Sequence, residues 1–265
     1  MDNSTVYHIN WFLRVNMAFH LLAACLFFIP GFWFYGLIVM LVSQVVLVAQ
    51  GLWPRSQWLG TNIVKIPGAK AGNAVFITID DGPNPDVTPQ VLQILDRYNA
   101  KATFFCIGEK VSRYPGLAKL IVDSGHKLEN HSMVHSYRFS LWGMQKICRD
   151  ISNAQISIQN VTGIQPHYFR APAGLRNVFL DFVLQKMNLH LVSWTRRGFD
   201  TQQNDAGKVL ERLCSDLQVG DILLLHDGNP ALTRQGNAVI VEVLPALLQK
   251  LQGINLSAKA LPDDL

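Results

Sequence analysis

The sequence predicts an α/β protein in which helices cover a largely parallel sheet, preceded by a hairpin of two membrane-spanning helices. Two observations lead to this class. From Asn73 onward, short apolar runs typical of strands alternate with segments of helical periodicity, which favours repeated β-α units. Upstream, residues 15–54 contain no Asp, Glu, Lys or Arg, although the 265-residue chain holds 23 basic and 19 acidic residues. With 49% apolar residues, the composition excludes a disordered chain.

The charge-free run predicts a membrane anchor over residues 1–58. One helix through the whole run would rise about 60 Å, twice the roughly 30 Å of the hydrocarbon core, so we expect two spans. Pro30-Gly31 lies near the middle and supplies the break. The expected helices cover about residues 11–29 and 32–53. A buried helical hairpin of a soluble fold is the alternative.

The flanking charges predict how this anchor is oriented. Arg14 precedes the charge-free run and Arg55 follows it, and basic residues gather on the cytoplasmic side of membrane proteins, so both ends are placed there. We therefore expect a protein of the bacterial cytoplasmic membrane. The cytoplasmic side is favoured for the part of the chain that follows the anchor. A secretory signal peptide is the competing interpretation, but the start MDNSTVYHIN lacks the basic segment that such a peptide needs.

The rest of the chain predicts a linker over residues 59–72 and a globular domain over 73–265. About 195 residues are too few for an eight-unit barrel, so a barrel of about seven strands or an open sheet fits better. A net charge of +4 without a cluster of basic and aromatic residues gives no support to nucleic-acid binding. The expected strands are 74–79, 102–108, 126–130, 167–170, 189–194, 221–226 and 254–258. The expected helices are 89–100, 116–125, 140–163, 177–188, 205–217 and 238–252.

Ionisable residues follow five of the predicted strands. In barrels and open α/β sheets, the carboxyl ends of the strands form the functional face, whereas structural polar residues should show no such bias. We therefore expect these side chains to meet at one site. They are Asp80 and Asp81, His131, Arg170, Asp200 and His226.

The pair of adjacent aspartates and the pair of histidines together predict a metal site. The HxxxH spacing of His131 and His135 puts both imidazoles on one side of a helical or turn-like backbone, a weak signal alone. A carboxylate from Asp80-Asp81 would complete a two-His, one-carboxylate set that leaves positions open for water and substrate. Because two adjacent carboxylates repel each other, one would bind the cation while the other accepts a proton from water. A turn with solvated carboxylates is the alternative interpretation.

Five motifs in a fixed order make the segment from Ala74 to Leu256 resemble the polysaccharide deacetylase family, also called the NodB homology domain or carbohydrate esterase family 4. The resemblance implies a distorted (β/α)7 barrel, which agrees with the length of the domain. The first two motifs are specific in combination, and the other three gain weight from their order. The motifs are TIDDGP at 78–83, HSMVH at 131–135, RAPAG at 170–174, SWTRRGFD at 193–200 and LLLHDG at 223–228.

The resemblance assigns roles to individual residues of this chain. It implies that Asp80 is the catalytic base and His226 the catalytic acid, and that Arg170 positions the base while Asp200 orients the acid. The implied metal ligands are Asp81, His131 and His135, with Zn²⁺ as the expected ion and Co²⁺ or another divalent ion as alternatives. The implied substrate contacts are the backbone N–H of Ala173 at the oxyanion, Leu224 in the acetyl pocket and Trp194.

The implied activity is hydrolysis of an N-acetyl group from an amino sugar in a polysaccharide or a lipid-linked glycan, with membrane lipid as a further partner. A deformylase on the same fold and a catalytically inactive glycan-binding protein remain open as alternatives. The chain departs from the family pattern at Ile79, Arg197 and Thr201, where the family usually has Phe, an acidic residue and Trp. We expect Arg196-Arg197 in a strand-to-helix loop, where the pair is either solvated or in contact with a phosphate. A phosphate contact would hint at a lipid-linked substrate.

Overall fold

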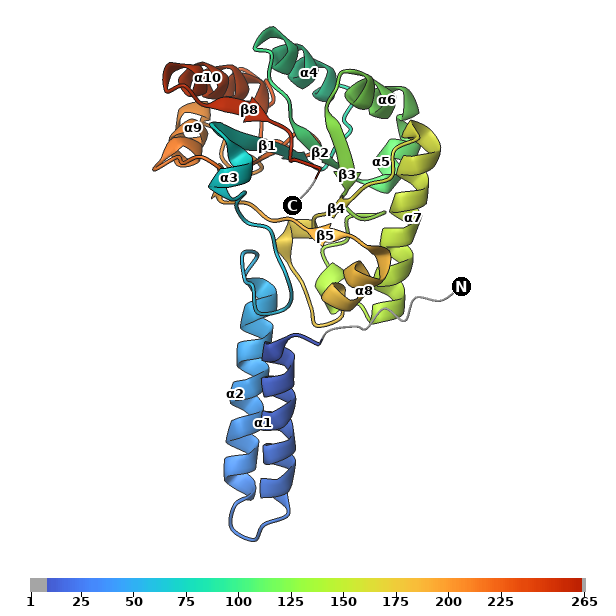
Figure 1. Cartoon of the computed structure of the whole chain (residues 1–265), viewed down its shortest axis with the longest axis vertical. Coiled ribbons are helices and arrows are strands. Elements are labelled where there is room, and N and C mark those ends of the chain that lie inside the picture. The colour runs from blue at the N-terminus through green and yellow to red at the C-terminus, as the bar shows by residue number, and fades with distance from the viewer. Residues whose placement is uncertain (1–8, 264–265) are drawn as a thin grey trace.

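The computed structural model describes residues 9–263, and it begins with a hairpin of two long helices that projects from a globular domain (Figure 1). Helix α1 (Trp11–Phe27) and helix α2 (Trp33–Leu52) run antiparallel, and their bounds agree with those of the two expected helices to within two residues. The turn between them contains Gly31, whose φ of +84° lies in the left-handed region that favours glycine. Proline followed by glycine therefore separates the helices, as expected.

Close packing and paired polar groups hold the hairpin together. Gly36 permits the approach, because a Cβ there would lie 2.8 Å from the carbonyl oxygen of Ala23. Asn16 Nδ2 donates a hydrogen bond of 2.7 Å to Ser43 Oγ. The outward faces carry many exposed apolar side chains. Among the described helices, α2 alone is both long and apolar enough to cross a membrane, whereas α1 is apolar but shorter.

The domain is built on one curled sheet of eight strands in the described residues, and every pairing between these strands is parallel. The order is β5-β4-β3-β2-β1-β7-β6, with β8 also paired to β1. All seven expected strands are present, and β6 is an addition to them. The α/β class and the barrel-like parallel sheet are thus confirmed. The strands are β1 (Ala74–Asp80), β2 (Thr103–Cys106), β3 (Lys127–Asn130), β4 (Tyr168–Phe169), β5 (His190–Leu191), β6 (Arg196–Arg197), β7 (Ile222–His226) and β8 (Ser257–Lys259).

The two faces of the sheet follow the alternation of side chains along each strand. On β1, Val75, Ile77 and Ile79 join the large apolar core under the helices, while Phe76 belongs to the cluster inside the curl. Asp80 continues the inner face and ends the strand. The helices that cover the outer face in Figure 1 are α4 (Thr88–Arg97), α5 (Gly108–Arg113), α6 (Pro115–Asp123), α7 (Met144–Thr162), α8 (Leu180–Met187), α9 (Ala206–Cys214) and α10 (Val239–Gly253). The short helix α3 (Gly68–Ala71) instead contributes Ala71 to the cluster inside the curl, and two 3-10 turns, η1 (Phe139–Leu141) and η2 (Pro172–Gly174), complete the described elements.

The segment between the hairpin and β1 packs along the open side of the curl. Ile63 N–H donates to the carbonyl of Leu191 at 2.9 Å, and its own carbonyl accepts from Ser193 N–H at 2.9 Å. Ile66, fully buried, donates to the carbonyl of Gly220 at 2.8 Å. The chain leaving the hairpin is therefore fixed to the edge of the domain beside β5 and β7.

Candidate active site

A cleft of about 300 Å³ opens at the carboxyl ends of the strands. It brings together eight of the ten residues predicted for the site, and the other two, Arg170 and Asp200, lie buried behind it. The convergence expected from the strand ends therefore occurs. The lining residues are Asp80, Asp81, His131, His135, Tyr137, Ala173, Gly174, Trp194, Arg197, Thr201, Gln202, Leu224, His226 and Asn229.

Asp81, His131 and His135 form a cluster with the geometry of a metal site. One Asp81 oxygen, Oδ1, lies 3.3 Å from His131 Nε2 and 3.1 Å from His135 Nε2. The potential ligand atoms of the three residues all lie within 4.8 Å of one another. Asp81 Oδ1 is buried and has no hydrogen-bond donor. A buried carboxylate oxygen without a donor, facing two imidazole nitrogens, fits a divalent cation.

The surroundings prepare these ligands for a cation. His131 Nδ1 lies 2.8 Å from the carbonyl oxygen of Arg170, which as acceptor fixes the proton on Nδ1 and leaves Nε2 free to coordinate. Burial lowers the pKa of His135 to about 4, so His135 is neutral at pH 7. Burial raises the pKa of Asp81, but attraction to both histidines lowers it by more, and the carboxylate is ionised.

Two glycines from separate motifs let the loop that carries Asp81 and Gly82 (the aspartate loop) adopt its shape. Asp81 has a φ of +71°, and its carbonyl occupies the space where Gly228 would carry a Cβ. A Cβ on Gly82 would lie 2.5 Å from Asp227 Oδ1. The first and last motifs therefore pack against each other at the cleft: a side chain at Gly228 would displace Asp81, and one at Gly82 would displace Asp227.

Asp80 is held by the most buried arginine of the domain. Arg170 Nη1 donates to Asp80 Oδ1 at 2.6 Å and to Thr78 Oγ1 at 2.8 Å. The remaining guanidinium nitrogens donate to the carbonyls of Val192 (3.2 Å) and Ser193 (2.9 Å). Every guanidinium nitrogen of Arg170 thus has an acceptor, and one carboxylate oxygen of Asp80 is held by the arginine rather than turned to the cleft.

His226 and Asp200 form a second buried pair. His226 Nδ1 lies 2.8 Å from Asp200 Oδ1, and His226 N–H donates to Asp200 Oδ2 at 2.7 Å. Burial lowers the pKa of His226, but the charge and hydrogen bond of Asp200 raise it by more, so the net shift is upward. The imidazole is therefore held in one orientation, with its Nε2 side toward the cleft and a tendency to keep its proton.

The other predicted contacts lie on the walls of the cleft. Ala173 sits in η2 with a left-handed φ of +53°. Trp194 and Leu224 are both buried and belong to the apolar cluster inside the curl. Trp194 and Leu224 thus form an apolar wall beside the aspartates and histidines of the cleft.

The loop expected at Arg196-Arg197 is wrong, because these residues form strand β6 beside β7. Alternation along a strand sends the two side chains to opposite faces. Arg196 Nε pairs with Asp221 Oδ2 at 3.2 Å, outside the cleft, whereas Arg197 is in register with Leu224 and lines the cleft. A two-residue strand has too short a pattern to be read from sequence.

Sequence reasoning also missed the residues that brace the aspartate loop. Lys110, on the unexpected helix α5, donates to the carbonyls of Asp81 (2.7 Å) and Gly228 (3.3 Å). Thr88 Oγ1 donates a very short hydrogen bond to Asp227 Oδ2, and burial raises the pKa of Asp227 to about 7. The acidic residue directly after the predicted acid, in LLLHDG, was the signal available in the sequence.

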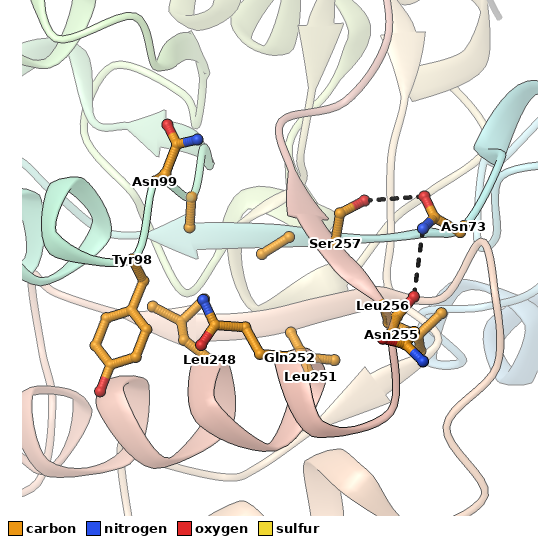
Figure 2. Close-up of a pocket in the computed structure, with 11 residues that line it drawn as sticks. Asn73, Tyr98, Asn99, Leu248, Leu251, Gln252, Asn255, Leu256 and Ser257 are labelled. Carbon is orange, nitrogen blue, oxygen red and sulfur yellow. Dashed lines mark hydrogen bonds between the residues drawn. The ribbon is translucent and has the colours of Figure 1, made fainter.

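A second cavity of about 300 Å³ lies at the opposite end of the strands, where β1 and β8 begin. Figure 2 shows Asn73 hydrogen-bonded to Ser257 and to the carbonyl of Asn255 on one side, with Tyr98 on the other. Its described lining contains no acid, histidine or basic residue. Chemistry-bearing side chains are thus gathered at one end of the sheet.

The fold and the cleft define a carbohydrate-esterase type of barrel with a His/His/Asp cluster. Residues 68–192 match the model of the polysaccharide deacetylase family. The chain is 32% identical over 197 residues to the chitooligosaccharide deacetylase of Azorhizobium caulinodans, an alignment that covers 72% of this chain and 93% of that protein. The chain therefore belongs to the polysaccharide deacetylase family.

Two further comparisons agree. The peptidoglycan-N-acetylglucosamine deacetylase PgdA of Listeria monocytogenes is 33% identical over 165 residues, 62% of this chain, and the chain spans about a third (34%) of the length of that relative. The structure of a family 4 carbohydrate esterase from Streptomyces lividans, in complex with acetate, superimposes with a TM-score of 0.64 at 28% identity. That superposition covers 71% of this chain and 92% of the esterase.

Proposed function

We propose that this protein is a metal-dependent hydrolase that removes the N-acetyl group from an amino sugar of a glycan. One observation carries the proposal: a candidate metal cluster lies in the same cleft as two separately buried pairs, Asp80 with Arg170 and His226 with Asp200. Amide hydrolysis needs a base for water and an acid for the departing amine at once. Two paired groups in different surroundings supply both.

Asp81, His131 and His135 would hold the ion, with Zn²⁺ as the expected occupant because two imidazoles and one carboxylate form a common catalytic zinc set. A bound divalent ion would supply Lewis-acid polarisation of the acetyl carbonyl and of the attacking water. The donor-free Oδ1 of Asp81 supports this assignment.

The base and the acid follow from the two pairs. Asp80 presents its second oxygen, Oδ2, on the cleft side, where it would take the proton of the attacking water, while Arg170 holds the other oxygen. His226 would donate a proton to the amine nitrogen as the C–N bond breaks. Asp200 favours the protonated imidazole that this step requires.

The walls of the cleft would position the acetyl group. The N–H of Ala173 would donate to the carbonyl oxygen as it gains charge. Leu224 would pack against the acetyl methyl, and Trp194 against the sugar. The lining of the cleft by all three residues supports these roles.

We also propose the division of the chain into a membrane anchor (residues 1–58), a connecting segment (59–72) and the deacetylase domain (73–265). The exposed apolar faces of α1 and α2 support the anchor, because a soluble protein rarely exposes so large an apolar surface. Both helices would then cross a bacterial membrane, with the domain on its cytoplasmic side. The relatives named above act on peptidoglycan N-acetylglucosamine and on chitooligosaccharides, so the substrate would be a glycan of N-acetylglucosamine type.

The test is acetate release from N-acetylchitooligosaccharides by the full chain in detergent, alongside its metal content. Asp81→Ala and His131→Ala should each lose the metal and at least about 10³-fold in kcat/KM, because both the ion and its charge stabilisation disappear. His190→Ala, a histidine exposed on β5 and outside the cleft, is the matched control and should keep both. Full activity in either ligand variant would refute the proposal. Release of formate in place of acetate, from a formylated substrate, would favour the deformylase alternative. Glycan binding without hydrolysis would favour a catalytically inactive glycan-binding protein.

A further inference from the structure

The cleft lies directly against the end of the helical hairpin. Pro54, two residues after α2 ends, accepts a hydrogen bond of 2.7 Å at its carbonyl from Ser193 Oγ. A Cβ on Gly174 would lie 2.7 Å from the Pro54 side chain and 2.7 Å from Trp194. Gly174 and Trp194 both line the cleft. The wall of the cleft and the end of the hairpin are therefore in contact.

This end of the hairpin has the features of a membrane–water interface. Helix α2 has 20 residues and so rises about 30 Å, the thickness of the hydrocarbon core. Trp11, Trp53 and Trp58 gather at the domain end, with the rings of Trp11 and Trp58 5.7 Å apart. Tryptophans at this position are typical of the interface. A hairpin inserted in a bilayer would thus bring the cleft to the level of the lipid headgroups.

Arg197 brings a positive charge into the cleft that no acid neutralises within residues 9–263. Its guanidinium lies 4.8 Å from the ring of Phe199 and 5.6 Å from that of Trp194, and its buried Nε has no acceptor. Its neighbour Arg196, in contrast, is paired with Asp221. Of the acids nearby, Asp80 is bound by Arg170 and Asp200 by His226.

We propose that the substrate is an N-acetylated amino sugar joined through phosphate to a membrane lipid, and that Arg197 binds the phosphate. The inference rests on the proposed deacetylase function and names its substrate. A guanidinium with an unused N–H donor recognises phosphate oxygens. A cleft wall at headgroup level presents that guanidinium where the lipid linkage of such a glycan lies. A neutral polymer in free solution needs neither feature.

The test compares three substrates that carry the same disaccharide of N-acetylglucosamine. They are the neutral disaccharide, its soluble 1-phosphate, and its phosphate-linked phytanyl lipid in phospholipid vesicles that contain the full chain. We expect kcat/KM to rise in that order, with the lipid-linked form at least about tenfold above the neutral one, since each charge-assisted contact is worth about a tenfold gain. Equal values for all three overturn the inference. If kcat/KM is equal for the soluble phosphate and the lipid-linked form, the claim that the recognised phosphate belongs to a membrane lipid is refuted.

Arg197 variants test the residue itself. In Arg197→Gln, the ratio of kcat/KM for the lipid-linked form to that for the neutral form should fall about tenfold, and in Arg197→Lys it should fall less. Arg196→Gln is the matched control, because this neighbouring arginine lies outside the cleft, and it should keep the wild-type ratio. An unchanged ratio in Arg197→Gln refutes the assignment. If the wild-type protein releases acetate from none of the three substrates, the proposed function fails and the inference with it.

Discussion

The hairpin and the cleft both bury polar groups, but they satisfy them differently. In the hairpin, neutral groups match each other: the buried Asn16 Nδ2 donates to the buried Ser43 Oγ at 2.7 Å. In the cleft, ionised groups are buried and one of their oxygens is left without a donor, at Asp81 Oδ1. Burial of a charged group without a partner is costly. The donor-free oxygen of Asp81 supports the proposed cation site, whereas Asn16 and Ser43 of the hairpin satisfy each other.

The adjacent aspartates repeat this contrast within two residues. Asp80 has one oxygen saturated by Arg170 at 2.6 Å, while Asp81 faces two imidazoles and no donor for Oδ1. Neighbouring carboxylates of the same type thus have different surroundings, as the proposed division between base and metal ligand requires. Separate removal of each carboxylate charge is the most direct way to break the comparison.

The largest effect among these tests is expected for Asp80→Asn. An amide keeps the size of the side chain and an oxygen to accept from Arg170, but it cannot take a proton from water. We expect kcat to fall about 10² to 10⁴-fold, the range of a general base, with metal content unchanged. Steady-state kinetics and metal analysis on the same preparation check this. Loss of metal in Asp80→Asn would place Asp80 among the ligands and end the division of roles.

A smaller effect, with a distinct pH signature, is expected for Asp200→Asn. In the wild type, burial lowers the pKa of His226 and Asp200 raises it by more, so the acid keeps its proton to a pH above its ordinary pKa. Without the Asp200 charge, the largest influence that raises the pKa of His226 is lost, and this pKa falls. We expect kcat to fall about tenfold near neutral pH, with the alkaline limb of its pH profile moved to lower pH.

The profile of kcat from pH 5 to 10 measures this shift, and metal content and circular dichroism report on the fold. A limb that stays in place while kcat falls would mean that Asp200 only orients the imidazole. An unchanged kcat at every pH would remove His226 as the acid.

The sequence was sufficient to predict most of the site because each motif follows a strand. Asp80, His131, Arg170 and His226 come directly at the ends of buried runs, and parallel strands bring their carboxyl ends to one edge of the sheet. The order of elements was likewise readable from periodicity. Both depend on local patterns repeated over several residues.

The features that could not be predicted depend on contacts without a local pattern. Strand β6 has two residues, and its pairing with β7 decides that Arg197 enters the cleft while Arg196 leaves it. The packing of Ile63 and Ile66 along the edge of the domain arises from tertiary hydrogen bonds. The contact between Pro54 and Gly174 joins segments far apart in the chain, so only the folded molecule shows that the hairpin adjoins the cleft.

The smallest effect is expected in the hairpin, for Asn16→Leu. The variant removes the hydrogen bond to Ser43 but adds an apolar side chain where helix packing accommodates one. Within the proposed membrane anchor, such an interhelical hydrogen bond would contribute about 0.6 kcal/mol on average. We therefore expect thermal unfolding in detergent to shift by only a few degrees and kcat/KM to stay at the wild-type value. A double-mutant cycle with Ser43→Ala isolates the coupling between the two side chains. A coupling of several kcal/mol, or a tenfold loss of activity, would mean that the neutral pairs of the hairpin carry a task comparable with the charged pairs of the cleft, and the contrast between the two regions would no longer hold.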